Sequence, residues 1–292
     1  MTTPSTQSGV TKTFSYNGQG QRTQAVDEEG RTTEYEYYAS GDNKYGLLKK
    51  VKLDPSGLAL VTEYLYDSSQ QLASVTAPGS LTTAHVFDAL GRKVKVTTPT
   101  GIETEWHYDG NGNVTSIDVE NLDMAGSRVS GNEWLTTSYT YGTHNQQLTV
   151  TEELDASTTR TTTFDYDDNL NRIRVTTPEG NQEKWTYNSR NLAATHVRGE
   201  TSGVESTTTY AYDDNGSLTS VTDARSNATT YEFDLFDRRI KTVNALGHYE
   251  LLDYDKASNV TMVRRYDATP DPDVVLQRST RSYDQRNRLW KT

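Results

Sequence analysis

The segment FDALGRKVKVTTPTGIETEWHYDGNG, residues 87–112, contains one full period of the pattern that decides the fold. It starts with an aromatic residue and an Asp, passes through a turn sequence, and continues into the alternating stretch 93–97. A second turn containing Pro and Gly follows, and the chain then reaches the next aromatic pair, Trp106 and Tyr108. Two short strands joined by tight turns are the simplest structure for such a unit.

The aromatic pair, two rings separated by one residue, recurs twelve times, beginning with Phe14 and Tyr16. Of its 24 positions, 21 hold Phe, Tyr or Trp, out of 28 such residues in the chain (19 + 4 + 5). Residues i and i+2 of a strand face the same way, so stacked repeats would pack these rings in columns. The predicted structural aromatic ladder comprises Tyr37, Tyr64, Tyr66, Phe87, Trp106, Tyr108, Tyr139, Tyr141, Phe164, Tyr166, Trp185, Tyr187, Tyr210, Tyr212, Tyr231, Phe233, Tyr254 and Tyr283.

An Asp follows the second aromatic in eight of the twelve copies. Its carboxylate can accept the backbone N–H two residues further on, which is the Asx turn, and Pro and Gly at the other end of the unit suit a second tight turn. The predicted turn residues are Asp67, Asp88, Asp109, Asp167, Asp213, Asp234, Asp255 and Asp284.

The spacing of the second aromatics favours hairpins. Successive intervals are 21, 29, 21, 21, 33, 25, 21, 25, 21, 21 and 29 residues, so each is 21 plus a multiple of four. A hairpin that gains two residues on each arm grows by four and keeps every side chain on its original face. We expect almost no helix, protruding hairpins within 109–141 and 255–283 (with the tip at 267–273), and smaller extensions near 155–157 and 200–203.

Composition limits the classes of function. The chain has 292 residues, a net charge of -11 and 33% hydrophobic residues, values that would suggest disorder without the periodic aromatics, each of which can bury about 150–250 Å². The acidic balance argues against nucleic acid as a partner. There is no Cys, and the polar start MTTPSTQSGV resembles neither a signal peptide nor a membrane span.

The predicted fold is all-β: tandem antiparallel hairpins that form a curved, spiralling sheet, part of a hollow shell or an open barrel. We expect a polar N-terminal arm at 1–12 and a single array of about twelve repeats over 13–292, the last one incomplete. No linker or shift in composition divides the chain.

The units YDSSQQLASVTAPGS (66–80), FDALGRKVKVTTPTG (87–101) and YDDNGSLTSVTDARS (212–226) resemble the YD repeat of the Rhs family. The resemblance covers about residues 13–292, although single copies drift, as at Tyr187 and Phe233. It implies a long sheet that spirals into a hollow shell, as in bacterial Rhs proteins, insecticidal toxin-complex subunits and animal teneurins. In the bacterial members the shell encloses a C-terminal toxin, and carbohydrate binding has been proposed for some repeats.

One motif of the bacterial pattern is displaced. The family's core ends in Asp-Pro-x-Gly-Leu, which is associated with self-cleavage and is followed by the toxin. Here the only similar string is Asp54-Pro55-Ser56-Gly57-Leu58, at the Pro/Gly turn of an ordinary repeat, and we interpret it as a turn. The resemblance therefore implies a shell segment whose toxin cargo is not present in this chain.

Catalytic and metal-binding signatures are weak. The five His residues lack metal-ligand spacing, the acidic clusters lack the DxDxDG order of a calcium loop, and the recurring Asp residues favour turns over a single glycosidase pair. We therefore predict no enzyme activity, no metal and no cofactor. The candidates for ligand or partner contact are Trp134 and Tyr266, because both aromatics lie outside the columns on predicted long hairpins.

The leading hypothesis is a non-catalytic segment of a secreted or surface-delivered bacterial shell that encapsulates or presents a C-terminal toxin or effector. Its expected partners are the remaining repeats of a longer shell, or other copies through edge strands. The alternative is a carbohydrate-binding or adhesion repeat at a cell surface, and a weaker one is a phage-tail-like spike.

Overall fold

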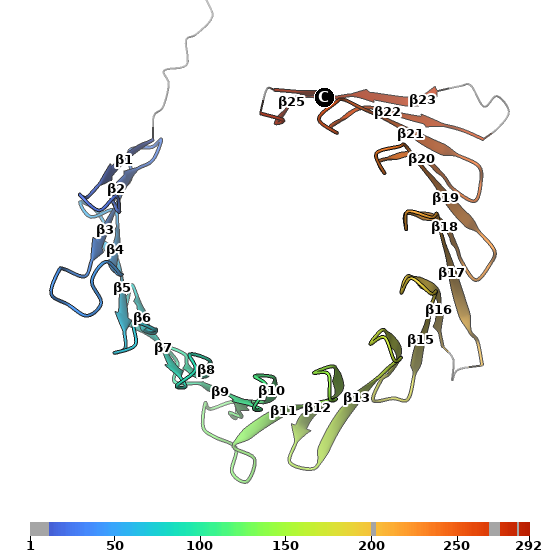
Figure 1. The fold of residues 1–292 in the computed structure, drawn as a ribbon. Coiled ribbons are helices and arrows are strands. Elements are labelled where there is room, and N and C mark those ends of the chain that lie inside the picture. Colours follow the sequence, from blue (N-terminus) through green and yellow to red (C-terminus); the bar gives the residue numbers. More distant parts are fainter. Residues whose placement is uncertain (1–11, 200–202, 269–274, 285) are drawn as a thin grey trace, which may run out of the picture. The chain divides into compact units, whose positions relative to one another are not determined.

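The computed structural model describes residues 12–199, 203–268, 275–284 and 286–292, and this part of the chain consists of strands and turns without a helix (Figure 1). The prediction of an all-β fold built from antiparallel hairpins is confirmed. Of the predicted arm at 1–12 only Lys12 is described. Most of the predicted tip at 267–273 and of the extension at 200–203 also lies outside the described residues.

The chain forms two compact units, one made of Met1–Thr140 with Thr151–Thr159 and the other of Tyr141–Val150 with Arg160–Thr292. In the first unit each strand pairs antiparallel with the next along the chain, from β1 to β11. The strands are β1 (Thr13–Tyr16), β2 (Arg22–Val26), β3 (Thr32–Tyr37), β4 (Leu48–Leu53), β5 (Leu60–Tyr66), β6 (Leu72–Ala77), β7 (Leu81–Phe87), β8 (Lys93–Thr97), β9 (Glu103–Tyr108), β10 (Val114–Glu120) and β11 (Trp134–Tyr141).

Strands β12 (Gln147–Asp155) and β13 (Thr158–Tyr166) contribute residues to both units. In the second unit consecutive strands again pair antiparallel, from β13 to β23, and a separate two-stranded sheet joins β24 to β25. The strands are β14 (Arg172–Thr176), β15 (Gln182–Tyr187), β16 (Ala193–Arg198), β17 (Ser206–Tyr212), β18 (Leu218–Thr222), β19 (Ala228–Phe233), β20 (Arg239–Val243), β21 (Tyr249–Tyr254), β22 (Val260–Tyr266), β23 (Val275–Thr280), β24 (Ser282–Tyr283) and β25 (Leu289–Lys291).

Eleven of the twelve repeats carry a β-bulge at the same place, which the sequence did not reveal. In β7 and β8, Val86 pairs with Lys95 whereas Phe87 pairs with Lys93, so the strand that follows the turn holds one extra residue. Ten further hairpins show this shift at the second aromatic. A bulge bends its strand and increases the local twist, so the regular bulges bend each unit's sheet at these repeats.

The turn after the second aromatic also has a fixed backbone. Its fourth residue has a positive φ, a conformation that Gly adopts without steric cost. Gly91 and Gly112 hold this position with φ of 80° and 89°. Leu170 takes the same conformation with φ of 65°, although a residue with a Cβ atom is strained there.

The longer intervals are built in more than one way. Strands β12 and β13 have nine residues each, so this hairpin gains length on both arms as predicted. The prediction is wrong for the interval from Tyr37 to Tyr66, where the turn between β3 and β4 occupies ten residues, 38–47, against five in 88–92. Residues in a turn belong to neither face of the sheet, so an odd insertion there leaves the strand register intact.

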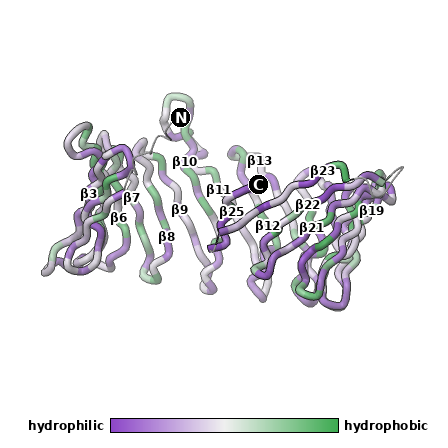
Figure 2. The backbone as a smooth tube through the Cα atoms, turned by 90° about the horizontal axis from the view of Figure 1, so that it is seen from above, coloured by the Kyte–Doolittle hydropathy of each residue, from purple (hydrophilic) through white to green (hydrophobic). Residues whose placement is uncertain are grey.

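The units lack a conventional hydrophobic core within the described residues. Only Tyr38, Val263 and His196 are buried, at 8%, 9% and 8% exposure. Hydrophobic positions are spread along the strands of both units (Figure 2). Stability must therefore come mainly from contacts between neighbouring strands.

Candidate functional site

The recurring site is the joint between one repeat and the next. In five of these joints the hydroxyl of the second-position Tyr donates a hydrogen bond to a backbone carbonyl of the preceding repeat. Tyr108 reaches Lys93 O at 2.7 Å and Tyr254 reaches Arg239 O at 2.8 Å. Tyr37, Tyr187 and Tyr283 make the equivalent bonds to Arg22 O, Arg172 O and Val260 O at 2.9, 2.9 and 3.0 Å.

The acceptor is the same in each joint: it is the residue that pairs with the second aromatic of the preceding repeat. Lys93 pairs with Phe87, and Arg239 pairs with Phe233. The bulge sets the position of this carbonyl, and the hydroxyl of the next Tyr meets it. This geometry explains why the position favours Tyr over Phe.

An Arg in the turn strengthens two of these joints. Arg92 bonds its own turn residue Asp88 through Nε at 2.7 Å, and its guanidinium lies 4.4 Å from the ring centroid of Tyr108 in the next repeat. It also donates to Asp109 O at 3.3 Å. Arg238 repeats this arrangement, 4.6 Å from the ring centroid of Tyr254 and 3.1 Å from Asp255 O. A cation over an aromatic face is attracted to it, so each Arg links two repeats.

Other turns use amide side chains for the same link. Asn171 donates to Asp167 Oδ2 within its turn and to Asn191 Oδ1 in the next turn, both at 2.9 Å. Asn259 donates to Asn287 Oδ1 at 3.2 Å.

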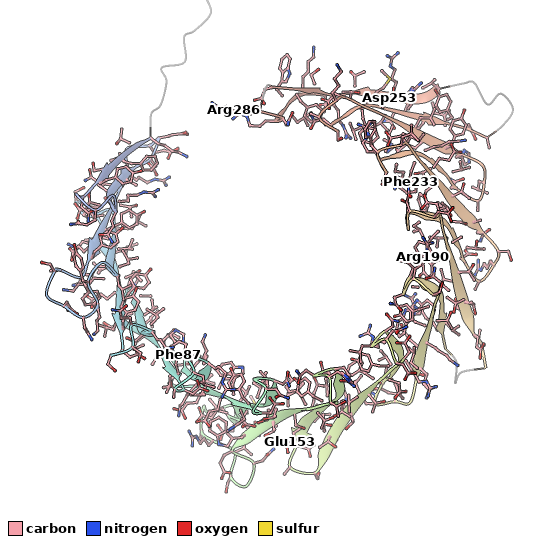
Figure 3. The ribbon with its side chains drawn as sticks, in the orientation of Figure 1. Phe87, Glu153, Arg190, Phe233, Asp253 and Arg286 are labelled. Carbon is pink, nitrogen blue, oxygen red and sulfur yellow. The ribbon has the colours of Figure 1, made fainter. Side chains whose placement is uncertain are left out.

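Arg190, labelled in Figure 3, makes a similar link with its guanidinium. It extends from the turn after β15 to the carbonyls of Asp213 and Asp214 in the turn after β17, at 2.7 and 2.8 Å. In the second unit, side chains therefore cross-link successive turns along this edge of the sheet.

Each turn Asp stabilises its own turn by accepting hydrogen bonds from backbone N–H groups. Asp88 Oδ1 accepts the N–H groups of Leu90 and Arg92, and Asp234 Oδ1 accepts those of Phe236 and Arg238. The backbone bond from Arg92 is the largest factor that lowers the pKa of Asp88, and the side-chain bond from Arg238 is the largest that lowers the pKa of Asp234. Hydrogen bonds to the charged form also lower the pKa of Asp109, Asp167, Asp255 and Asp284.

The structure places all 18 predicted ladder residues at half-buried strand positions. Across the strand, the first aromatic of a pair usually meets a β-branched residue: Tyr64 pairs with Val75, Trp106 with Ile117. Such pairs are favourable in sheets. By contrast, Phe14 and Tyr16 in β1 are 47% and 57% exposed.

Sequence reasoning missed the role of the turn Arg residues and of the residues paired with the second aromatic. Arg172 lies 5.8 Å from the ring centroid of Phe164 and 5.2 Å from that of Trp185, so it also bridges successive repeats. The signal was present as Gly-Arg in DALGR at 88–92. It could not be interpreted without the register that brings Arg92 over the next Tyr.

Of the two residues predicted to contact a ligand or partner, Tyr266 lies in the second unit beside a cavity. Its ring stacks on Tyr249 with centroids 4.5 Å apart and planes 7° apart. The cavity has a volume of ≈ 510 Å³, and its lining includes Arg239, Asn244 and His248 with both Tyr rings. His248 Nδ1 is 2.6 Å from Asp267 Oδ1.

Trp134, the other predicted contact residue, begins β11 in the first unit. It is half-buried, and the guanidinium of Arg128 lies 5.5 Å from its ring centroid. Arg128 in turn forms an ion pair with Glu120. These contacts fix the ring within its own hairpin.

Within the described ranges, no group of three or more His, Asp or Glu residues could hold a metal ion. The same residues include no helix with the length and hydrophobicity of a transmembrane segment. His196, the one buried His in this part of the chain, stacks on Trp185 with centroids 4.6 Å apart and lies 2.8 Å from Glu183 Oε2.

Comparisons with known proteins agree with this repeat. The model of the RHS repeat matches residues 66–103, 87–121 and 212–249, so the chain carries Rhs repeats. A search of curated proteins finds no match.

Three solved structures of Tc toxin components share the fold. The crystal structure of TcdB2-TccC3-Cdc42 has a TM-score of 0.57 at 14% identity, and that of TcdB2-TccC3 without the hypervariable C-terminal region has 0.57 at 15%. The Photorhabdus luminescens Tc holotoxin pore has 0.54 at 14%. Each match covers 95% of this chain but only 16% of the other, so the chain spans about a sixth of those proteins.

Proposed function

We propose that residues 13–292 form one array that serves as a non-catalytic segment of the wall of a shell, which encloses or presents a C-terminal toxin or effector. The observation that carries the proposal is the repeated joint, in which Tyr108 and Tyr254 donate to the preceding repeat and Arg92 and Arg238 lie over their rings. A repeat in the interior of the array can thus donate to the repeat before it and accept from the repeat after it, as the repeat of Tyr254 does. A sheet with such joints can be lengthened by further repeats, as the wall of a shell requires.

The similarity to toxin-complex components supports the same role and a secreted or surface-delivered bacterial setting. A single sheet with few buried residues has two accessible faces, so one face can line an interior while the other meets solvent. Other repeats of the same wall are the natural partners of such a segment.

The test uses the intact gene product and proteinase K. Peptides from the toxin or effector that the shell is proposed to hold are quantified by mass spectrometry for the wild type and for Tyr254→Ala, which weakens one joint of the wall. Encapsulation predicts that these peptides appear slowly in the wild type and much faster in the variant, with Leu235→Ala, at a fully exposed side chain, as a matched control that behaves like wild type. Equally fast release from all three proteins would contradict the role.

A carbohydrate-binding or adhesion module is the second candidate, favoured by the cavity beside the stacked Tyr249 and Tyr266 rings. Sugars stack on aromatic faces, and Arg239, Asn244 and His248 supply polar groups around them. A glycan array is the direct test. Binding that is lost in Tyr266→Ala would support this function, whereas the absence of any bound glycan would remove it.

A further inference from the structure

One position of the aromatic ladder holds a side chain that can change its charge near neutral pH. The first residue of the aromatic pair is Tyr64 in one repeat and Trp106 two repeats later, but it is His85 in the repeat between them. Two other pairs also lack Phe, Tyr or Trp there, but they have Leu252 and Arg281, which do not titrate between about pH 5 and about pH 8. His does, because its ordinary pKa is about 6.5.

His85 is packed in the same way as the aromatic residues of the neighbouring repeats. It is half-buried in β7, opposite Val96 of β8, just as Trp106 lies opposite Ile117. Its ring centroid is 6.5 Å from that of Phe87, with the two planes tilted by 42°. An uncharged ring suits this position between apolar side chains.

One nitrogen of the His85 ring has no partner. Nδ1 is shielded from solvent and forms no hydrogen bond within the part of the chain that the structure describes. In a neutral ring with its proton on Nε2, Nδ1 is an acceptor, whereas in the protonated ring both nitrogens are donors. Protonation would therefore leave a charged N–H group buried without an acceptor, which costs more than an unpaired neutral acceptor.

The charged groups of the strands that pair with β7 do not favour a proton on His85. Strand β6 has no ionisable side chain, and the ionisable residues of β8 are Lys93 and Lys95. Alternation along the strand places Lys95 on the opposite face, where its Nζ lies 2.7 and 3.3 Å from Glu103 and Glu105 of β9. Within these described strands, the charge on the side of the ring is therefore positive.

The other titratable groups on this face leave that balance unchanged. Strand β5 carries Tyr64 and Tyr66 and β9 carries Tyr108, and phenols stay neutral between about pH 5 and about pH 8. In the turn after β7, the carboxylate of Asp88 is paired with Arg92 at 2.7 Å. No carboxylate among these groups is free to accept a proton from the ring.

The direction of the pH effect follows from these surroundings. Burial lowers the pKa of His85, and the positive charge of Lys93 lowers it further. A His whose folded pKa lies below its unfolded value of about 6.5 contributes its full stability above that value. The contribution is lost as pH falls below about 6.5, because the unfolded ring then binds a proton that the folded ring resists.

We propose that His85 makes the hairpin of β7 and β8 a pH-sensitive point of the first unit, stable while the ring is neutral and loosened when the ring is protonated. The same hairpin supplies Lys93 O, which accepts the hydroxyl of Tyr108, so its loosening also weakens the joint to the next repeat. In the second unit, by contrast, His196 Nε2 lies 2.8 Å from Glu183 Oε2, so a protonated ring has an acceptor there.

This pH response belongs to the repeat itself and goes beyond the proposed wall, so it can be present whether or not the chain encloses a toxin. The loosening concerns one hairpin among many. It is therefore measured by the exchange of local amides and not by the melting temperature of the whole chain.

Hydrogen–deuterium exchange of the full chain at about pH 7.5 and about pH 5.5, corrected for the intrinsic pH dependence of exchange, provides the test. At about pH 5.5, one unit below the unfolded pKa, the protection of peptides that cover β7 and β8 should fall by up to about tenfold. In His85→Phe, which introduces the residue found at Phe14 and Phe164, the same peptides should be equally protected at both pH values.

His196→Val is the matched control. It removes a buried His from the second unit and introduces the kind of residue that faces the ring in other repeats, as Val75 faces Tyr64. This variant should keep the pH dependence of β7 and β8. Equal pH dependence of these peptides in the wild type and in His85→Phe, or none in the wild type, would overturn the proposal.

An NMR titration of the His85 ring in the wild type gives a second measurement that needs no altered fold. The expected midpoint lies below about 6.5, because burial opposes the charged ring. A midpoint at or above this value would contradict the proposal, since protonation would then not weaken the hairpin.

Discussion

Two turns of the second unit have the same backbone arrangement but link to the next repeat by different chemistry. Asp234 and Asp255 each accept the N–H groups of residues two and four positions further on. In the first turn the fifth residue is Arg238, which lies over the ring of Tyr254. In the second it is Asn259, which reaches Asn287 Oδ1 in the next turn.

The turn itself and the link to the next repeat therefore place different requirements on the fifth residue. Any side chain that can donate to the Asp carboxylate closes the loop, so Arg and Asn both serve there. The link to the next repeat is either a guanidinium over an aromatic ring, as for Arg238 and Tyr254, or a hydrogen bond between two amides, as for Asn259 and Asn287. The Tyr hydroxyl and the strand pairing are independent of this choice, which allows the turn sequence to vary while the joint persists.

Acid should break both kinds of turn at once, and this is the largest effect that we expect. The folded-state pKa values of Asp88, Asp109, Asp167, Asp234, Asp255 and Asp284 are lowered by their hydrogen bonds. A lowered pKa contributes stability above the unfolded value of about 3.9, and this stability is lost as pH falls through the folded value. The melting temperature should be nearly flat from neutral pH to about pH 5 and fall steeply below about pH 4. Melting curves that do not change down to about pH 3 would contradict the role of these carboxylates.

Removing the ring of one joint should have the next largest effect. Tyr254→Ala removes a half-buried ring, the hydrogen bond to Arg239 O and the platform under Arg238, and we expect a loss of about 3 kcal/mol in the free energy of unfolding. Tyr254→Phe keeps the ring and should cost only about 1 kcal/mol. Urea denaturation measures both. Equal losses would mean that the ring contributes nothing beyond its hydroxyl.

Truncating the fifth residue of each turn compares the two links directly. Arg238→Ala should cost about 1 kcal/mol because it loses the ring contact as well as the turn bond. Asn259→Ala should cost about half as much, since a neutral exposed amide contributes little. Repeating the measurements in high salt should narrow the difference, because salt screens the charged link. A larger loss for Asn259→Ala would reverse the interpretation of the two turns.

Replacing Leu170 should increase the free energy of unfolding through the backbone conformation alone. It occupies the position where Gly91 and Gly112 adopt positive φ, and its side chain is 43% exposed. Leu170→Gly should relieve strain and raise the free energy of unfolding by up to about 1 kcal/mol, less the entropy that Gly loses on folding. The matched change Gly91→Ala should lower it. Thermal melts of the two variants should therefore shift in opposite directions.

The sequence was sufficient to predict the hairpins, because paired rings and turn residues at a 21-residue period leave few other structures. It did not predict the bulge opposite the second aromatic, because the alternation along one strand does not show which residue it pairs with across the turn. The role of Arg92 depends on the register between repeats, which appears only when Tyr108 lies beneath its guanidinium. The ten-residue turn at 38–47 was missed because an insertion in a turn and one in the arms give the same total length.

We infer that stability lies in joints between neighbouring repeats and not in a shared core. Hydrogen–deuterium exchange of the Tyr254→Ala variant, followed by mass spectrometry, tests it most directly. In a chain of nearest-neighbour contacts, exchange should accelerate in β19 to β22 and stay at the wild-type rate in β3 to β8. Acceleration to the same degree in every strand would show a single cooperative core and contradict the claim.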